Sequence, residues 1–75
     1  MNNFDSKEVQ ISVGKQIKYI RKKNNLTQAN LAHLSGMEES ALQRIEAGRT
    51  NPTIKTLFKI SKAFKIEFKD LFENF

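Results

Sequence analysis

The chain has 75 residues and a mass of 8.7 kDa, and its thirteen Lys and Arg residues outnumber eight Asp and Glu residues to give a net charge of +5. A chain of this length forms one domain with one small core, and the absence of cysteine excludes a disulfide framework, a thiolate nucleophile and a cysteine-based zinc site. The positive charge lies in two blocks without acids, residues 9–37 and 47–66, which is typical both of binding to a polyanion and of lysines at solvated helix ends.

The spacing of apolar residues predicts a first helix, which starts near residue 6 and ends near Asn24 and Asn25. Its apolar residues recur at intervals of three or four along one face, namely Val9, Val13, Ile17 and Ile20. Asp5 and Glu8 fit a capping box at its start, and Asn24 and Asn25 tolerate the backbone of a helix C-terminal cap.

Two short helices are expected next. The first begins at Thr27, a good N-cap, and ends at Gly36, with Leu31, Ala32 and Leu34 on its buried side. The second runs from about Glu39 to Ala47 and ends before Gly48, with Leu42 and Ile45 facing inward.

Two further helices complete the prediction. A fourth helix is capped by Thr53 and carries the apolar residues Ile54, Leu57, Phe58 and either Ile60 or Ser61. A short fifth helix runs through Phe68, Leu71 and Phe72. The expected architecture is a compact all-α bundle of five helices in a single domain of residues 1–75, whose residues 1–8 form an extension that can belong to the first helix.

The segment LTQANLAHLSGMEESALQRIEAGRTNPT, which starts at Leu26, resembles the Cro/repressor-type (XRE, lambda-repressor-like) helix-turn-helix transcriptional regulators. Ala32 stands where two helices cross closely, and Gly36 stands at a turn that needs a positive φ. The likeness extends over roughly residues 11–73, and its helix-turn-helix core is residues 27–47.

The resemblance implies that the third helix lies in the DNA major groove and reads base edges with Glu39, Ser40, Gln43 and Arg44. Arg44 can bind guanine and Gln43 adenine, each through two hydrogen bonds. Contacts to the DNA backbone are implied for Gln28, Glu38, Arg49, Thr50, Asn51 and Lys55. The resemblance also implies a structural ion pair between Arg21 and Glu46.

Glu38 and Glu39 depart from the family pattern, because carboxylates oppose the approach to phosphates. Three explanations remain open. Glu39 accepts a hydrogen bond from cytosine N4, or the domain binds DNA weakly or only as a dimer, or its groove-facing surface binds a protein partner.

The C-terminal segment is rich in phenylalanine, with five of the six phenylalanines in its last 18 residues. A core position is the default for each, but a chain of 75 residues is too small to enclose all five. We therefore expect a homodimer interface at Phe68, Phe72 and Phe75, which would bring two recognition helices about 34 Å apart onto an inverted repeat.

These features predict a cytoplasmic, sequence-specific double-stranded DNA-binding regulator, a homodimeric repressor or autoregulator. The alternative is a protein-interaction module or antitoxin of the same fold with weak or no operator binding. No enzyme, cofactor, metal or membrane association is expected. His33 is the only histidine, and none of the glycines belongs to a phosphate-binding loop.

Overall fold

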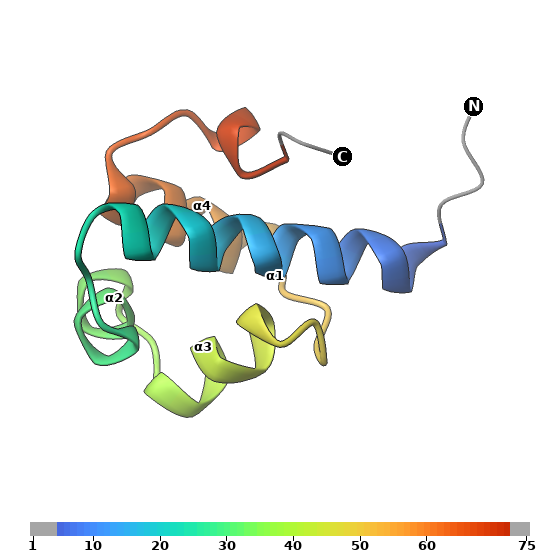
Figure 1. The fold of residues 1–75 in the computed structure, drawn as a ribbon, viewed down its shortest axis with the longest axis horizontal. Helices are drawn as coiled ribbons and strands as arrows, with labels where there is room; N and C mark the ends of the chain where they lie inside the picture. The colour runs from blue at the N-terminus through green and yellow to red at the C-terminus, as the bar shows by residue number, and fades with distance from the viewer. Residues whose placement is uncertain (1–4, 73–75) are drawn as a thin grey trace.

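The computed structural model describes residues 5–72 and is helical, without a strand in that range. Its elements in chain order are α1 (Ser6–Lys23), α2 (Gln28–Ser35), α3 (Glu39–Glu46), α4 (Ile54–Phe64) and the 3₁₀-helix η1 (Phe68–Phe72). α1 crosses the whole molecule, with α2 and α3 on one side of it and η1 on the other (Figure 1). α2 packs against both α3 and α4, while η1 packs against α1 and α4.

The fifth predicted helix is a 3₁₀-helix of five residues, so the prediction of five α-helices is corrected to four and a 3₁₀ turn. A segment this short cannot complete enough i→i−4 hydrogen bonds to favour an α-helix. Leu71 within it is completely buried, which anchors the turn to the core.

Three of the four helices begin at the polar caps that the sequence predicts. The side chains of Asp5, Thr27 and Thr53 each accept a hydrogen bond from the backbone N–H three residues on, at 2.8, 3.0 and 3.0 Å. Each bond satisfies one of the N–H groups that a helix start leaves without an intrahelical acceptor. α3 differs, since its N-cap residue Glu38 makes no side-chain capping bond.

Two of the predicted helix ends have the expected left-handed backbone at glycine, with φ of 66° at Gly36 and 72° at Gly48. α4 ends at Lys65, whose φ is 60° although it carries a side chain. A left-handed backbone brings the Cβ atom of an L-residue too close to the following carbonyl oxygen, which costs about 1–2 kcal/mol. Lys65 therefore lowers the stability of the fold.

We expect Lys65→Gly to raise the free energy of unfolding by about 1 kcal/mol, because glycine adopts this backbone without a Cβ clash. Urea unfolding followed by circular dichroism measures the change. The control is Lys59→Gly, an exposed site inside α4, which should lower stability by about 1 kcal/mol through the poor helix propensity of glycine. A loss of stability in both variants would contradict this account of the helix end.

The core lies between α1, α4 and the pair formed by α2 and α3. Its buried apolar residues are Val13, Ile17, Leu31, Ala32, Leu42, Ile45, Leu57, Ile60, Phe64 and Leu71. Ala32 is buried, as expected where two helices cross closely. The sequence left open whether Ile60 or Ser61 belongs to the inner face of α4, and both residues are buried there.

Three residues that the sequence predicts on apolar helix faces are exposed to solvent in the structure. Leu34 is 56% exposed, because the buried side of α2 runs through Leu31, Ala32 and Ser35. The buried face of α4 is formed by Leu57, Ile60, Ser61 and Phe64. That leaves Ile54 69% and Phe58 52% exposed.

Candidate nucleic-acid interface

α3 has one apolar and one polar side. Leu42 and Ile45 are buried, whereas the four residues predicted to read bases are exposed: Glu39, Ser40, Gln43 and Arg44. Within residues 5–72, none of these four side chains makes a hydrogen bond or an ion pair. The helix therefore offers a row of uncommitted donors and acceptors to solvent.

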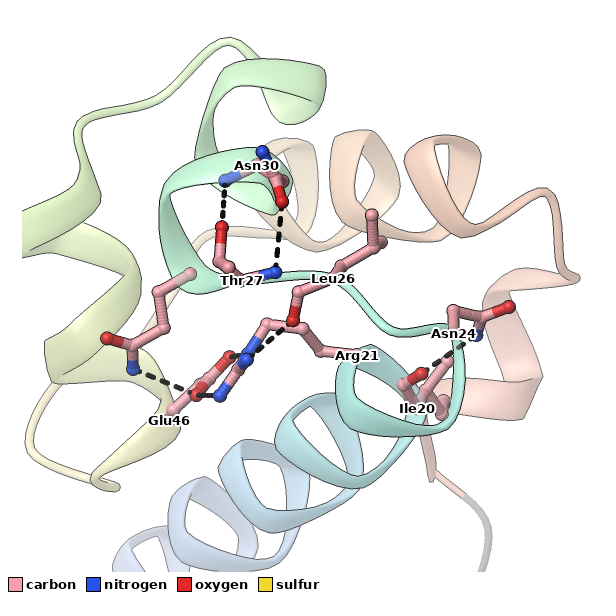
Figure 2. Close-up of polar contacts among 8 residues, drawn as sticks. Ile20, Arg21, Asn24, Leu26, Thr27, Asn30 and Glu46 are labelled. Atoms are coloured by element: carbon pink, nitrogen blue, oxygen red, sulfur yellow. Dashed lines mark hydrogen bonds and ion pairs between the residues drawn. The ribbon is translucent and has the colours of Figure 1, made fainter.

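A buried ion pair holds α3 in place. Arg21 at the end of α1 donates from Nε to Glu46 Oε2 at 2.7 Å and from Nη2 to Glu46 Oε1 at 3.1 Å. A third donor, Nη1, binds the backbone oxygen of Leu26 at 2.8 Å (Figure 2). Arg21 and Glu46 are each 7% exposed, so the pair expected from the resemblance is present and lies inside the fold.

Gln28 extends this network to the start of α2. Its Nε2 donates to Glu46 Oε1 at 3.0 Å, a contact that the sequence did not indicate. The carboxylate of Glu46 thus binds the last turn of α1 and the first turn of α2 from its own place at the end of α3. The network thus joins three helices at one carboxylate, and we expect it to specify their relative orientation.

The residues expected on the DNA backbone follow α3 in the chain. Arg49, Asn51 and Lys55 are exposed and Thr50 is half-buried, over the loop between α3 and α4 and the first turn of α4. The backbone N–H of Arg49 donates to the carbonyl oxygen of Arg44 at 2.9 Å, which ties this loop to the end of α3.

Charge is distributed unevenly along α3. Glu38 and Glu39 are exposed at its start, while Arg44 lies in its last turn and Arg49 just after it. Acids at the N-terminus and bases at the C-terminus complement the helix dipole. A polyanion approaching α3 therefore meets repulsion at one end and attraction at the other.

Phe68 and Phe72, two of the three residues expected at a dimer interface, belong to η1, which lies on the other side of α1 from α3 (Figure 1). The rings of Phe68 and Phe72 have centroids 5.3 Å apart, and both residues are half-buried against the core. Gln16 Nε2 donates to the carbonyl oxygen of Asp70 at 3.0 Å and ties η1 to α1. Phe75 lies outside the described residues.

The part of the chain that the structure describes, residues 5–72, lacks two other kinds of site. No group of three His, Cys, Asp or Glu residues is placed to bind a metal ion there. None of the helices has the length and apolar character needed to span a bilayer.

Residues 17–71 match the HTH_3 helix-turn-helix family. An uncharacterised HTH-type transcriptional regulator of Methanocaldococcus jannaschii is 39% identical over 57 residues, which cover 76% of this chain and 86% of that protein. The immunity repressor protein of Bacillus phage phi105 is 40% identical over 57 residues, 76% of this chain and 40% of that protein. The restriction-modification controller protein C.AhdI from Aeromonas hydrophila matches in structure with a TM-score of 0.83 and 30% identity, covering 84% of this chain and 96% of that one. The chain belongs to the HTH_3 (XRE, Cro/repressor-type) family of DNA-binding transcriptional regulators.

Proposed function

We propose that this single-domain chain is a homodimeric repressor or autoregulator that binds an inverted repeat in double-stranded DNA through α3. The observation that carries the proposal is the exposed polar face of α3, whose side chains are uncommitted within residues 5–72. The buried network of Arg21, Glu46 and Gln28 supports it, because base reading needs a recognition helix held in a fixed orientation.

Each side chain on this face has a natural partner among the bases. The guanidinium of Arg44 binds guanine O6 and N7 together, and the amide of Gln43 binds adenine N6 and N7. Glu39 accepts from cytosine N4, which turns the charge that opposes phosphate into base selectivity. Ser40 donates to or accepts from either kind of base.

Phosphate contacts fix the register of the domain on DNA without reading sequence. Arg49 and Lys55 supply charge to them, and Thr50 and Asn51 supply neutral donors. At Gln28 one amide N–H binds Glu46, so the second N–H is the group that donates to phosphate. At Glu38 the contact comes from the backbone N–H, since the carboxylate is repelled.

The dimer is proposed to form through the phenylalanines of the C-terminal segment, Phe68, Phe72 and Phe75. Two copies joined there would present their α3 helices about 34 Å apart, one turn of DNA. Sedimentation velocity tests this arrangement. A chain that stays monomeric well above micromolar concentration would contradict the dimer but leave base reading by α3 untouched.

Selection from a randomised duplex library tests the proposal as a whole, followed by binding of the selected duplex over a salt series. An inverted repeat with a steep fall in affinity with salt is the expected result. Recovery of no common sequence, with only weak binding of random duplexes, would contradict it.

Arg44→Ala is expected to lose about 1–3 kcal/mol of discrimination at one base position of the selected site, because a bidentate contact to one base is removed. The matched control is Arg49→Ala, which should weaken binding to all sequences alike and lower the salt slope by about 1. Competition with single-base variants of the site separates the two effects. Unchanged discrimination in the Arg44 variant would show that another face reads the bases.

A second candidate function is favoured by the two exposed carboxylates at the start of α3, Glu38 and Glu39. In this reading the domain is a protein-interaction module or antitoxin whose α3 face binds DNA weakly. Replacement of both residues by glutamine separates the functions. A site-independent gain in DNA affinity supports the second candidate, whereas a loss of selectivity at one cytosine supports the first.

A further inference from the structure

A hollow of about 570 Å³ lies between the end of α2 and the outer side of α4, and we call it the α2–α4 hollow. Its apolar walls include Leu34 and Phe58, which are 56% and 52% exposed. None of the residues assigned above to DNA or to the dimer lines it. An exposed leucine and an exposed phenylalanine at one hollow form the kind of apolar patch that marks a binding surface.

The rim of the α2–α4 hollow is basic. Lys59, Lys62 and Lys65 line it, and its lining within the described residues includes no Asp or Glu. Lys62 Nζ stands 5.7 Å from the centroid of the Phe58 ring, so charge and apolar surface are immediate neighbours. A partner that covers the apolar walls must also bring negative charge to these three lysines.

One residue that lines the hollow carries an unsatisfied polar group. Ser35 lines the hollow and is 4% exposed, and its Oγ has no hydrogen-bond partner among the described residues. Buried hydroxyl groups are nearly always hydrogen-bonded in native proteins. Oγ is itself shielded from solvent, so a partner on the surface meets the walls and the rim of the hollow rather than this hydroxyl.

Three occupants can be compared on these features. DNA phosphates would meet the lysines but leave Leu34 and Phe58 without a contact. A second copy bound face to face would place the three lysines of each copy against those of the other, because a two-fold contact uses the same patch twice. A partner protein with acidic residues around apolar anchors matches both the walls and the rim.

We propose that the α2–α4 hollow docks an acidic amphipathic helix of a partner protein, independently of the DNA-reading face of α3. Leucines or other large apolar residues at i, i+3, i+4 and i+7 of that helix pack on Leu34 and Phe58. Its carboxylates pair with Lys59, Lys62 and Lys65. The hollow is open to solvent rather than enclosed, which suits a helix lying across it better than a small molecule.

The probe is a synthetic helical peptide with leucine at i, i+3, i+4 and i+7 and glutamate at the remaining surface positions. It is titrated into the isotope-labelled chain, and amide chemical shifts are followed by NMR. The expected result is saturable shifts confined to the end of α2 and to α4. A peptide with alanine in place of leucine, and one with lysine in place of glutamate, should not bind.

Variants of exposed residues test the site without disturbing the core. Phe58→Ser and the pair Lys59→Glu with Lys62→Glu should each weaken peptide binding about tenfold or more. The matched controls lie on α1: Tyr19→Ser, at a residue 58% exposed, and Lys18→Glu with Lys22→Glu, at two exposed lysines. Equal weakening in the controls, or shifts centred on α3, would overturn the proposal.

Two further measurements separate the other occupants from this one. If Phe58→Ser converts a dimer into a monomer in sedimentation, the hollow belongs to a second copy and the proposal is overturned. If Phe58→Ser loses the selected DNA duplex, the hollow belongs to the DNA interface and the proposal is likewise overturned. If Phe58→Ser retains DNA binding and loses peptide binding, the docking proposal is supported. If the unmodified chain binds the peptide but selects no DNA sequence, only the function proposed for α3 is refuted.

Discussion

Glu46→Ala is expected to lower the free energy of unfolding by about 3–5 kcal/mol, because it leaves the guanidinium of Arg21 buried without a counter-charge. Two Arg21 donors and the Nε2 of Gln28 lose their acceptor in the same step. A domain of this size has a total stability of roughly 4–11 kcal/mol, so the loss is a large share of it and would unfold a domain at the lower end of that range.

Urea unfolding followed by circular dichroism measures this loss, and Glu39→Ala is the matched control. Glu39 is exposed and unpaired within the described residues, so its replacement should change stability by about 0.5 kcal/mol or less. Replacing both partners, Arg21→Met with Glu46→Leu, should recover part of the loss, since no buried charge remains. Equal stability of the Glu46 and Glu39 variants would show that the pair contributes nothing.

The helix boundaries could be predicted from the sequence because local chemistry sets them. A side chain at Asp5, Thr27 or Thr53 bonds an N–H only three residues away, and the positive φ of Gly36 suits the one residue type without a Cβ atom. These determinants act within a single turn of chain. Neighbouring elements change them little, and so the predicted starts and turns agree with the structure.

Structural features that depend on packing between helices could not be predicted from the spacing of apolar residues in the sequence. Leu34 has the spacing of a buried residue, yet α2 is so short that its rotation is set by its packing on α3 and α4, which buries Ser35 instead. For the candidate site, helical periodicity predicted which side of α3 faces solvent, whereas the bond from Gln28 to Glu46 needs three helices to be in place.

Gly14 is the clearest example of a residue whose role depends on the assembled fold. In the sequence it is an isolated glycine inside a helix, a position where glycine ordinarily costs about 1 kcal/mol relative to alanine. In the structure a Cβ atom added at Gly14 would collide with the backbone oxygen of Ile45 and lie 3.0 Å from that of Glu46. The backbones of α1 and α3 therefore touch here, and only glycine allows the approach.

We expect Gly14→Ala to lower the free energy of unfolding by about 3 kcal/mol, at the upper end of what overpacking costs, because rigid backbone must move to admit the methyl group. The displaced segment is the end of α3, so Glu46 moves relative to Arg21 and α3, the helix proposed to read bases, loses its fixed orientation. Affinity for a selected DNA site should then fall even where the variant is still folded. Urea unfolding and DNA titration on the same preparation measure both effects.

Gly36→Ala separates the stability lost through steric crowding from the stability lost through a left-handed backbone. No heavy atom outside its chain neighbours lies within 4 Å of a Cβ atom added at Gly36, but its φ is +66°, so this variant should lose only about 1–2 kcal/mol. The larger loss at Gly14 would then reflect the contact between α1 and α3 alone. A gain in stability for Gly14→Ala, as helix propensity predicts, would mean that α3 can shift freely. It would contradict the proposal that α1 holds α3 in one orientation.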